Sequence, residues 1–221
     1  MRLLELEKAI QKEPSVELLD KTKETLFVYD HDNSMEICFT DEDSISEEWL
    51  ENKIWINQKL VHRFNFNKDN IAKVLMQMFA KEELQTLKQI YVIYQKKDFD
   101  YIAKKNDEEL PEIDSFWINQ VGLMWFSHQT IFINMNEIEK FARKFALSWS
   151  EFEDEITSGF WITLFHELRH LTLDTHIFLS EDKYPIEESS EIKVEHFGID
   201  TFKQLSYSDL NYEIRTIQAI F

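Results

Sequence analysis

The sequence is poor in cysteine, glycine and proline, and each shortage narrows what the chain can be. Cys38 is the only cysteine among 221 residues, so no disulfide can form within the chain. Glycine and proline occur only three times each, which disfavours long flexible linkers and low-complexity tracts. Hydrophobic residues make up 43% of the chain and aromatic residues 14%, which is enough apolar material for a packed core.

Positive charge is also in deficit. The 24 lysines and arginines face 42 acidic residues, which gives a formal net charge of −18. A surface this acidic repels phosphate backbones and anionic lipid, so we expect neither nucleic acid nor a membrane as a partner. No run of residues approaches the length of a membrane span, and residues 1–20 lack the apolar core of a signal peptide. We therefore expect a cytoplasmic protein.

Apolar periodicity predicts a mixed α+β fold. Short alternating or continuous apolar runs predict strands within residues 25–40, 53–66, 89–95 and 120–134. Helical spacing predicts helices at residues 2–13, 68–87, 137–148, 151–174 and 188–205, and the charged stretch 96–112 is typical of a loop. The expected architecture is a small mixed sheet followed by a mainly helical C-terminal half.

The stretch WITLFHELRHLTLDTH, residues 161–176, contains the pattern H-E-x-x-H at His166, Glu167 and His170. Residues four apart on a helix lie one turn apart, a rise of ~6 Å, so two imidazoles can converge on one zinc ion. The intervening glutamate is turned by roughly 100° around the axis, where it can act as general base on water. The flanking residues are apolar, and a buried helix with these polar groups is costly unless they are paired. The alternative is that the histidines lie at the surface or bond to backbone carbonyls.

A catalytic zinc needs a third protein ligand, and two candidates follow the motif. His176 has the spacing of the third histidine in the metzincin pattern, which has a glycine where this chain has Leu173. A β-carbon disfavours the left-handed turn that would swing His176 back, and in a continuing helix it would point away from the other two histidines. His176 is therefore the less favoured ligand.

The favoured third ligand is Glu191, which follows His170 by 21 residues. That separation lets the chain loop around and present a second helix across the ion. Glu195 lies one helical turn further on, where it can accept a hydrogen bond from the far nitrogen of a ligand histidine. The alternative for both residues is an ordinary solvated acidic helix face.

This combination of motifs resembles the gluzincin branch of the zinc metallopeptidases, especially the compact ImmA/IrrE type. The resemblance covers about residues 120–205 and includes the strand TIFIN, the helix FWITLFHELRH and the later EIKVEHFG. It implies a zincin-like fold, Zn²⁺ held by His166, His170 and Glu191, and Glu167 as the catalytic base. It also implies that an edge strand at residues 129–134 pairs with an extended substrate. Arg169 stands where the motif usually has glycine. Its large, positively charged side chain could narrow the mouth of the site or change the charge there.

The resemblance divides the chain into residues 1–110, an α+β region of unknown role packed on the core, and residues 111–221, a zincin-like core. The expected activity is that of a zinc metalloendopeptidase acting on a protein or peptide substrate, with a regulatory partner also conceivable. The donor that stabilises the transition state is unassigned. His196 has the best claim to that role, ahead of Tyr184, Tyr207 and Tyr212.

Two other functions compete with proteolysis. One is a zincin-like binding or regulatory protein without proteolytic activity, and the other is an adaptor whose acidic surface mimics nucleic acid. An intact Glu167 argues against the first, because a purely structural metal site has no use for a base. The acidic residues are spread along the chain rather than gathered in one block, which argues against the second.

Overall fold

The computed structural model describes the backbone of residues 16–17, 25–30, 33–38, 40–106, 120–125, 128–179 and 189–206. Side-chain surroundings are described at residues 40–105, 120–125, 128–171 and 196–205. The helix expected at residues 2–13 lies outside the described residues.

The centre of the molecule is a four-stranded sheet in the order β4-β5-β7-β6. Strands β4 (Ile54–Ile56), β5 (Gln89–Ile93) and β7 (Thr130–Asn134) are parallel, whereas β6 (Gly122–Trp125) is antiparallel to β7. A second, three-stranded antiparallel sheet consists of β1 (Val16–Glu17), β2 (Thr25–Asp30) and β3 (Asn33–Cys38). The fold is thus mixed α+β with a small mixed sheet, as the sequence predicts.

Successive residues of the central strands belong to two different cores. Ile90, Val92 and Ile131 pack into the main hydrophobic cluster, whereas Tyr91 and Phe132 pack into a smaller aromatic cluster. This alternation follows from the pleat, which points neighbouring side chains to opposite faces. Because both faces are covered, the middle strands are almost entirely buried and read in sequence as continuous apolar runs.

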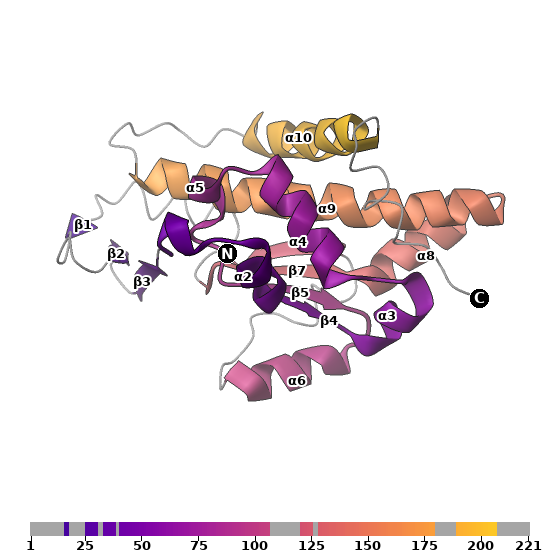
Figure 1. Ribbon diagram of the computed structural model, residues 1–221, viewed down its shortest axis with the longest axis horizontal. Helices are drawn as coiled ribbons and strands as arrows, with labels where there is room; N and C mark the ends of the chain where they lie inside the picture. The colour runs from indigo at the N-terminus through magenta and orange to yellow at the C-terminus, as the bar shows by residue number, and fades with distance from the viewer. Residues whose placement is uncertain are drawn as a thin grey trace.

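Helices cover both faces of the central sheet (Figure 1). The long helix α9 (Trp149–Leu179) lies across one face, and α10 (Ser189–Ser206) lies along the outer side of α9 and runs antiparallel to it. Helix α6 (Lys97–Asn106) lies on the opposite face. The remaining helical elements are η1 (Glu42–Ser44), α2 (Glu47–Lys53), α3 (Gln58–Phe64), α4 (Lys68–Met78), α5 (Lys81–Leu84) and α8 (Met135–Phe145).

Helix α9 forms because a capped start leads into a strongly apolar run. The Ser148 hydroxyl accepts a hydrogen bond from the Glu151 N–H at 3.2 Å, and this satisfies one of the exposed donors of the first turn. Phe160, Trp161 and Phe165 are then fully buried. Burying each of these large side chains contributes about 1.5–3 kcal/mol, so the helix is fixed firmly against the sheet.

Two sequence predictions about secondary structure are wrong. Residues 58–64 form helix α3 rather than a strand, because the Asn57 side chain accepts a hydrogen bond from the Lys59 N–H at 2.8 Å and starts a helix there. Residues 97–106 form helix α6 rather than a loop. The buried carboxylate of Asp98 accepts hydrogen bonds from the N–H groups of Tyr94 and Gln95 at 2.8 and 2.9 Å, which stabilises the start of that helix.

The expected division at residue 110 runs through the central sheet. Strands β4 and β5 precede that residue, and β6 and β7 follow it, yet all four belong to one sheet.

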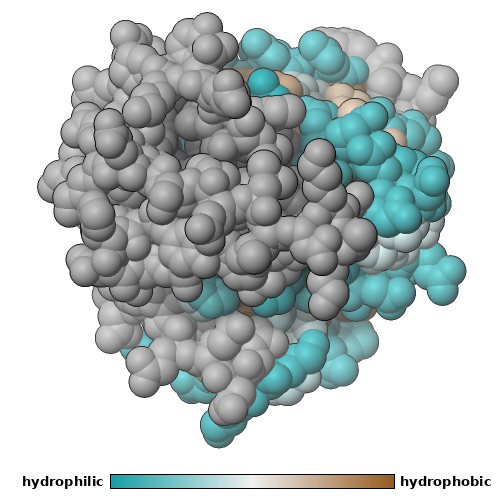
Figure 2. All heavy atoms as spheres, turned by 90° about the vertical axis from the view of Figure 1, so that its left-hand side faces the viewer, coloured by the Kyte–Doolittle hydropathy of each residue, from teal (hydrophilic) through white to brown (hydrophobic). Residues whose placement is uncertain are grey.

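On the side drawn in Figure 2, the described surface is mainly hydrophilic and has only small hydrophobic areas. Among the described helices, none combines the length and the apolar character that crossing a bilayer demands.

Candidate metal centre

The two histidines of the H-E-x-x-H motif converge on each other. The Nε2 atoms of His166 and His170 are 3.0 Å apart, and the two ring centroids are 4.7 Å apart with an interplanar angle of 72°. Both residues are half-buried on α9. The helix therefore directs the same atom of each ring toward one point.

The separation of the two nitrogens fits a shared zinc ion. At a Zn–N bond length of about 2.05 Å and a tetrahedral angle, two ligand nitrogens lie about 3.3 Å apart. A direct hydrogen bond needs one protonated and one unprotonated Nε2, whereas a metal needs the lone pair of both. The pair at 3.0 Å is thus compatible with either state, and neutral imidazoles are the ligands that zinc favours.

Glu167 lies between the helix and strand β6. The residue is only 7% exposed. A β-carbon added at Gly122 of β6 would come within 2.4 Å of Glu167 Oε1 and within 2.6 Å of Thr163 Cγ2. The carboxylate therefore occupies space that any other residue at position 122 would fill.

Helix α10 approaches the backbone of α9 beside the first histidine. A β-carbon at Gly198 would come within 2.8 Å of the Ile162 carbonyl oxygen and 3.5 Å of the His166 nitrogen. The Phe79 ring strengthens this contact, since its centroid lies 6.1 Å from those of both Phe165 on α9 and Phe197 on α10. The glycine thus lets the two helices pack closely at the turn that precedes the motif histidines.

Arg169 holds neighbouring elements to α9. Its guanidinium lies 3.5 Å from the Glu83 carboxylate of α5 and 5.0 Å from the ring centroid of Phe197 on α10. The side chain is 33% exposed, so the ion pair is partly screened and contributes at most about 1 kcal/mol. Arg169 therefore links α9 to α5 and α10, which gives a structural reason for an arginine within the motif.

The favoured third ligand lies on α10. Position 191 precedes Gly198 by seven residues, almost two helical turns, so the two positions share one face of the helix. That distance is about 10 Å along the axis, and because α10 is antiparallel to α9 it leads toward His170. The side chains of Glu191 and Glu195 lie outside the described residues. Among the side chains that are described, no group of three or more potential metal ligands comes together.

Two further candidate histidines, His176 and His196, lie on α9 and α10. The backbone of α9 continues as a helix through His176 to Leu179, so it does not leave the helix at Leu173 as the metzincin arrangement requires. The His176 side chain lies outside the described residues. His196 is exposed on α10, about 200° around the helix axis from the glycine that contacts α9. It does not approach His166 or His170 in this arrangement.

The edge strand expected at residues 129–134 is not at an edge. Strand β7 pairs with β5 on one side and with β6 on the other, so its hydrogen-bonding groups are already used. The sheet order places β6 at the end. Any strand addition on this side of the sheet must therefore involve β6, the strand that also carries Gly122.

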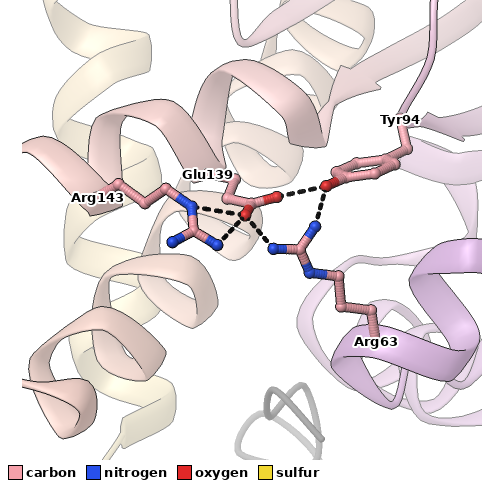
Figure 3. Close-up of polar contacts among 4 residues, drawn as sticks. All are labelled: Arg63, Tyr94, Glu139 and Arg143. Atoms are coloured by element: carbon pink, nitrogen blue, oxygen red, sulfur yellow. Dashed lines mark hydrogen bonds and ion pairs between the residues drawn. The ribbon is translucent and has the colours of Figure 1, made fainter. Parts of the chain in front are cut away.

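A second polar cluster lies at the carboxyl ends of the parallel strands (Figure 3). Glu139 of α8 accepts hydrogen bonds from Arg63, from Arg143 at 2.6 and 2.8 Å, and from the Tyr94 hydroxyl at 2.6 Å. Arg63 also donates to the Tyr94 oxygen. Burial, together with the hydrogen bond to Glu139, raises the pKa of Tyr94 to about 12. This cluster joins α3, the end of β5 and α8.

Sequence reasoning identifies the H-E-x-x-H residues but not their glycine neighbours. Gly122, Gly159 and Gly198 are the only glycines, and each lies where a β-carbon would meet another group within 2.4–2.8 Å. Their scarcity is the one signal that could have identified them, because glycine inside a strand or helix is costly without a packing reason.

The sequence matches no protein-family model, no curated protein and no solved structure.

Proposed function

We propose that the protein is a zinc-dependent endopeptidase with a zincin-like fold, in which His166, His170 and Glu191 hold Zn²⁺. The observation that carries the proposal is the convergence of the two Nε2 atoms to 3.0 Å on a helix that also carries the buried Glu167. Two neutral imidazole nitrogens that converge in this way can both give their lone pairs to one cation. The antiparallel course of α10 supports Glu191 as the third ligand, because it leads position 191 toward His170.

A zinc ion held by these residues would supply the Lewis acidity that makes water nucleophilic near neutral pH. Glu167 accepts a proton from the attacking water and delivers it to the amine nitrogen as the C–N bond breaks. Its burial beside β6 shields the carboxylate from bulk water. Glu195 hydrogen-bonds the far nitrogen of a ligand histidine and so fixes its tautomer.

The substrate is an extended segment of a protein or peptide. Strand β6 ends the sheet and runs past Glu167, so a segment that pairs with its outer edge passes the catalytic carboxylate. Backbone pairing of this kind selects for an extended conformation rather than for particular side chains. We therefore expect activity toward unfolded proteins before activity toward compact ones.

Metal analysis and hydrolysis, measured together, test the proposal. Purified wild-type protein should contain about one zinc per chain and cleave fluorescein-labelled casein, and a chelator should abolish the cleavage. Glu167→Gln should retain zinc and lose about 10²–10⁴-fold in rate, the usual contribution of a general base. Asp154→Asn is the matched control, because it makes the same acid-to-amide change at an exposed position of α9.

Three outcomes separate the proposal from its rivals. Wild-type protein without zinc would refute the metal site, and Glu167→Gln that cleaves as fast as wild type would refute the assigned base. Stoichiometric zinc without cleavage of casein or of a peptide library would instead favour a zincin-like binding protein. His170→Ala distinguishes specific binding from adventitious metal, because it should lose the zinc.

A further inference from the structure

The contact between β6 and the H-E-x-x-H helix is closer than ordinary packing between a strand and a helix. Without its hydrogen, the bare α-carbon of Gly122 leaves a space into which Glu167 Oε1 and Cγ project, 2.4 and 2.9 Å from where a β-carbon would stand. Glycine weakens a strand, and in strands it often marks a site where another group approaches the backbone closely. Here the group that approaches is the carboxylate itself.

The side chain next to this carboxylate has little freedom to give way. Thr163, one turn before Glu167, would meet a β-carbon at position 122 within 2.6 Å of its Cγ2. Its hydroxyl donates a hydrogen bond to the Gly159 carbonyl oxygen at 2.7 Å, which fixes the χ1 angle and with it the methyl group. A side chain at position 122 would therefore displace Glu167, whose longer side chain can rotate.

We propose that Gly122 is a positioning residue for the proposed peptidase: its missing side chain is what allows the Glu167 carboxylate to lie against β6. The catalytic part of this inference rests on the proposed function, whereas the contact between Gly122 and Glu167 does not depend on it. Strand β6, which we propose to pair with the substrate, would then also fix the position of the catalytic base. Misplacing a catalytic group by about 1 Å can cost about 100-fold in rate.

The test is Gly122→Ala, with two measurements. The first is the carboxyl ¹³C resonance of Glu167 in glutamate-labelled protein, assigned by its disappearance in Glu167→Gln. The second is zinc content together with the kcat and KM for fluorescein-labelled casein. We expect the resonance to move, the zinc content and KM to stay unchanged, and kcat to fall about 100-fold.

Gly159→Ala is the matched control. Its added methyl group would lie within 2.8 Å of Ile138 Cγ2, so it introduces a similar clash on the same helix without touching the carboxylate. It should lower the unfolding midpoint and leave both the Glu167 resonance and kcat as in wild type. If Gly122→Ala does not fold, Gly122→Ala/Thr163→Ser removes the clash with Cγ2 and retains the one with Oε1, and the same two measurements apply.

The outcomes distinguish this inference from the proposed function. A Glu167 resonance that is unchanged in the Gly122 variants would overturn the inference whatever the enzyme does. A resonance that moves while kcat is retained would overturn it too, because the placement of the carboxylate would not matter. Wild-type protein that holds no zinc and cleaves no casein would refute the proposed function and with it the catalytic role of Gly122, even if the resonance moves.

Discussion

Glu139 and Glu167 are both buried glutamates on helices that pack against the same sheet, yet their surroundings differ. They are 6% and 7% exposed. Glu139 receives two guanidinium groups and a phenol, so its negative charge is more than balanced (Figure 3). Glu167 instead lies against a glycine and a threonine and follows a histidine whose ring converges on a second histidine.

The difference separates a carboxylate that is held by cations from the one that we propose as the catalytic base. Arginine is charged at every accessible pH and offers donors in a fixed geometry, so Arg63 and Arg143 hold the Glu139 carboxylate in one arrangement. Imidazole changes its charge near neutral pH and binds metals, so the surroundings of Glu167 can exchange protons or a cation. Buried groups of the first kind contribute stability, whereas those of the second kind often cost it.

The largest effect on stability is expected for Glu139→Gln. The variant leaves Arg63 and Arg143 facing a neutral amide, and both lose the ion pair that they form with Glu139. We expect the free energy of unfolding to fall by about 2–3 kcal/mol, less than for a fully buried pair because the arginine side chains are 39% and 54% exposed. Urea unfolding followed by circular dichroism measures it.

Glu167→Gln is the comparison variant for this experiment. It should change the free energy of unfolding by less than about 1 kcal/mol, because glutamine keeps the shape of the side chain and one of its two acceptor oxygens. A loss of stability as large as that of Glu139→Gln would contradict the distinction between the two glutamates. So would a Glu139→Gln variant as stable as wild type.

A smaller effect, on zinc affinity rather than on stability, is expected for Gly198→Ala. Its methyl group would lie within 2.8 Å of the Ile162 carbonyl oxygen, and a backbone atom in a packed helix cannot move aside. Helix α10 must shift outward, and Glu191 with it. We expect zinc to bind about tenfold more weakly, as measured by competition with a chromogenic chelator.

Two variants show whether the loss of affinity acts through the third ligand. In a Glu191→Ala background, Gly198→Ala should weaken zinc binding no further, because the ligand that it displaces is gone. Gly159→Ala meets Ile138 rather than α10 and should leave zinc affinity unchanged. Equal losses from Gly198→Ala with and without Glu191 would contradict Glu191 as a ligand.

The sequence predicts the helix that carries His166 and His170 because its period, cap and apolar face agree over many turns. It predicts β5 and β7 as strands but not their places in the sheet, since strand order depends on long-range pairing. Residues 97–106 look like a loop by composition, yet the buried Asp98 starts a helix there. The approach of Gly122 to Glu167 joins residues 45 positions apart, and no local pattern encodes it.

The smallest effect is expected for Tyr94→Phe. Below about pH 10 the variant loses the hydrogen bond that the phenol donates to Glu139 and the one that it accepts from Arg63, and it should be less stable by about 1 kcal/mol. In the folded protein the pKa of Tyr94 is raised to about 12 from 10.0, so folding favours the neutral phenol. The stability that this shift contributes is complete below pH 10 and is lost as the pH rises through about 12. The difference in unfolding free energy between wild type and Tyr94→Phe should therefore shrink over that range, as urea unfolding at each pH would measure. A difference that stays constant would contradict the raised pKa of Tyr94.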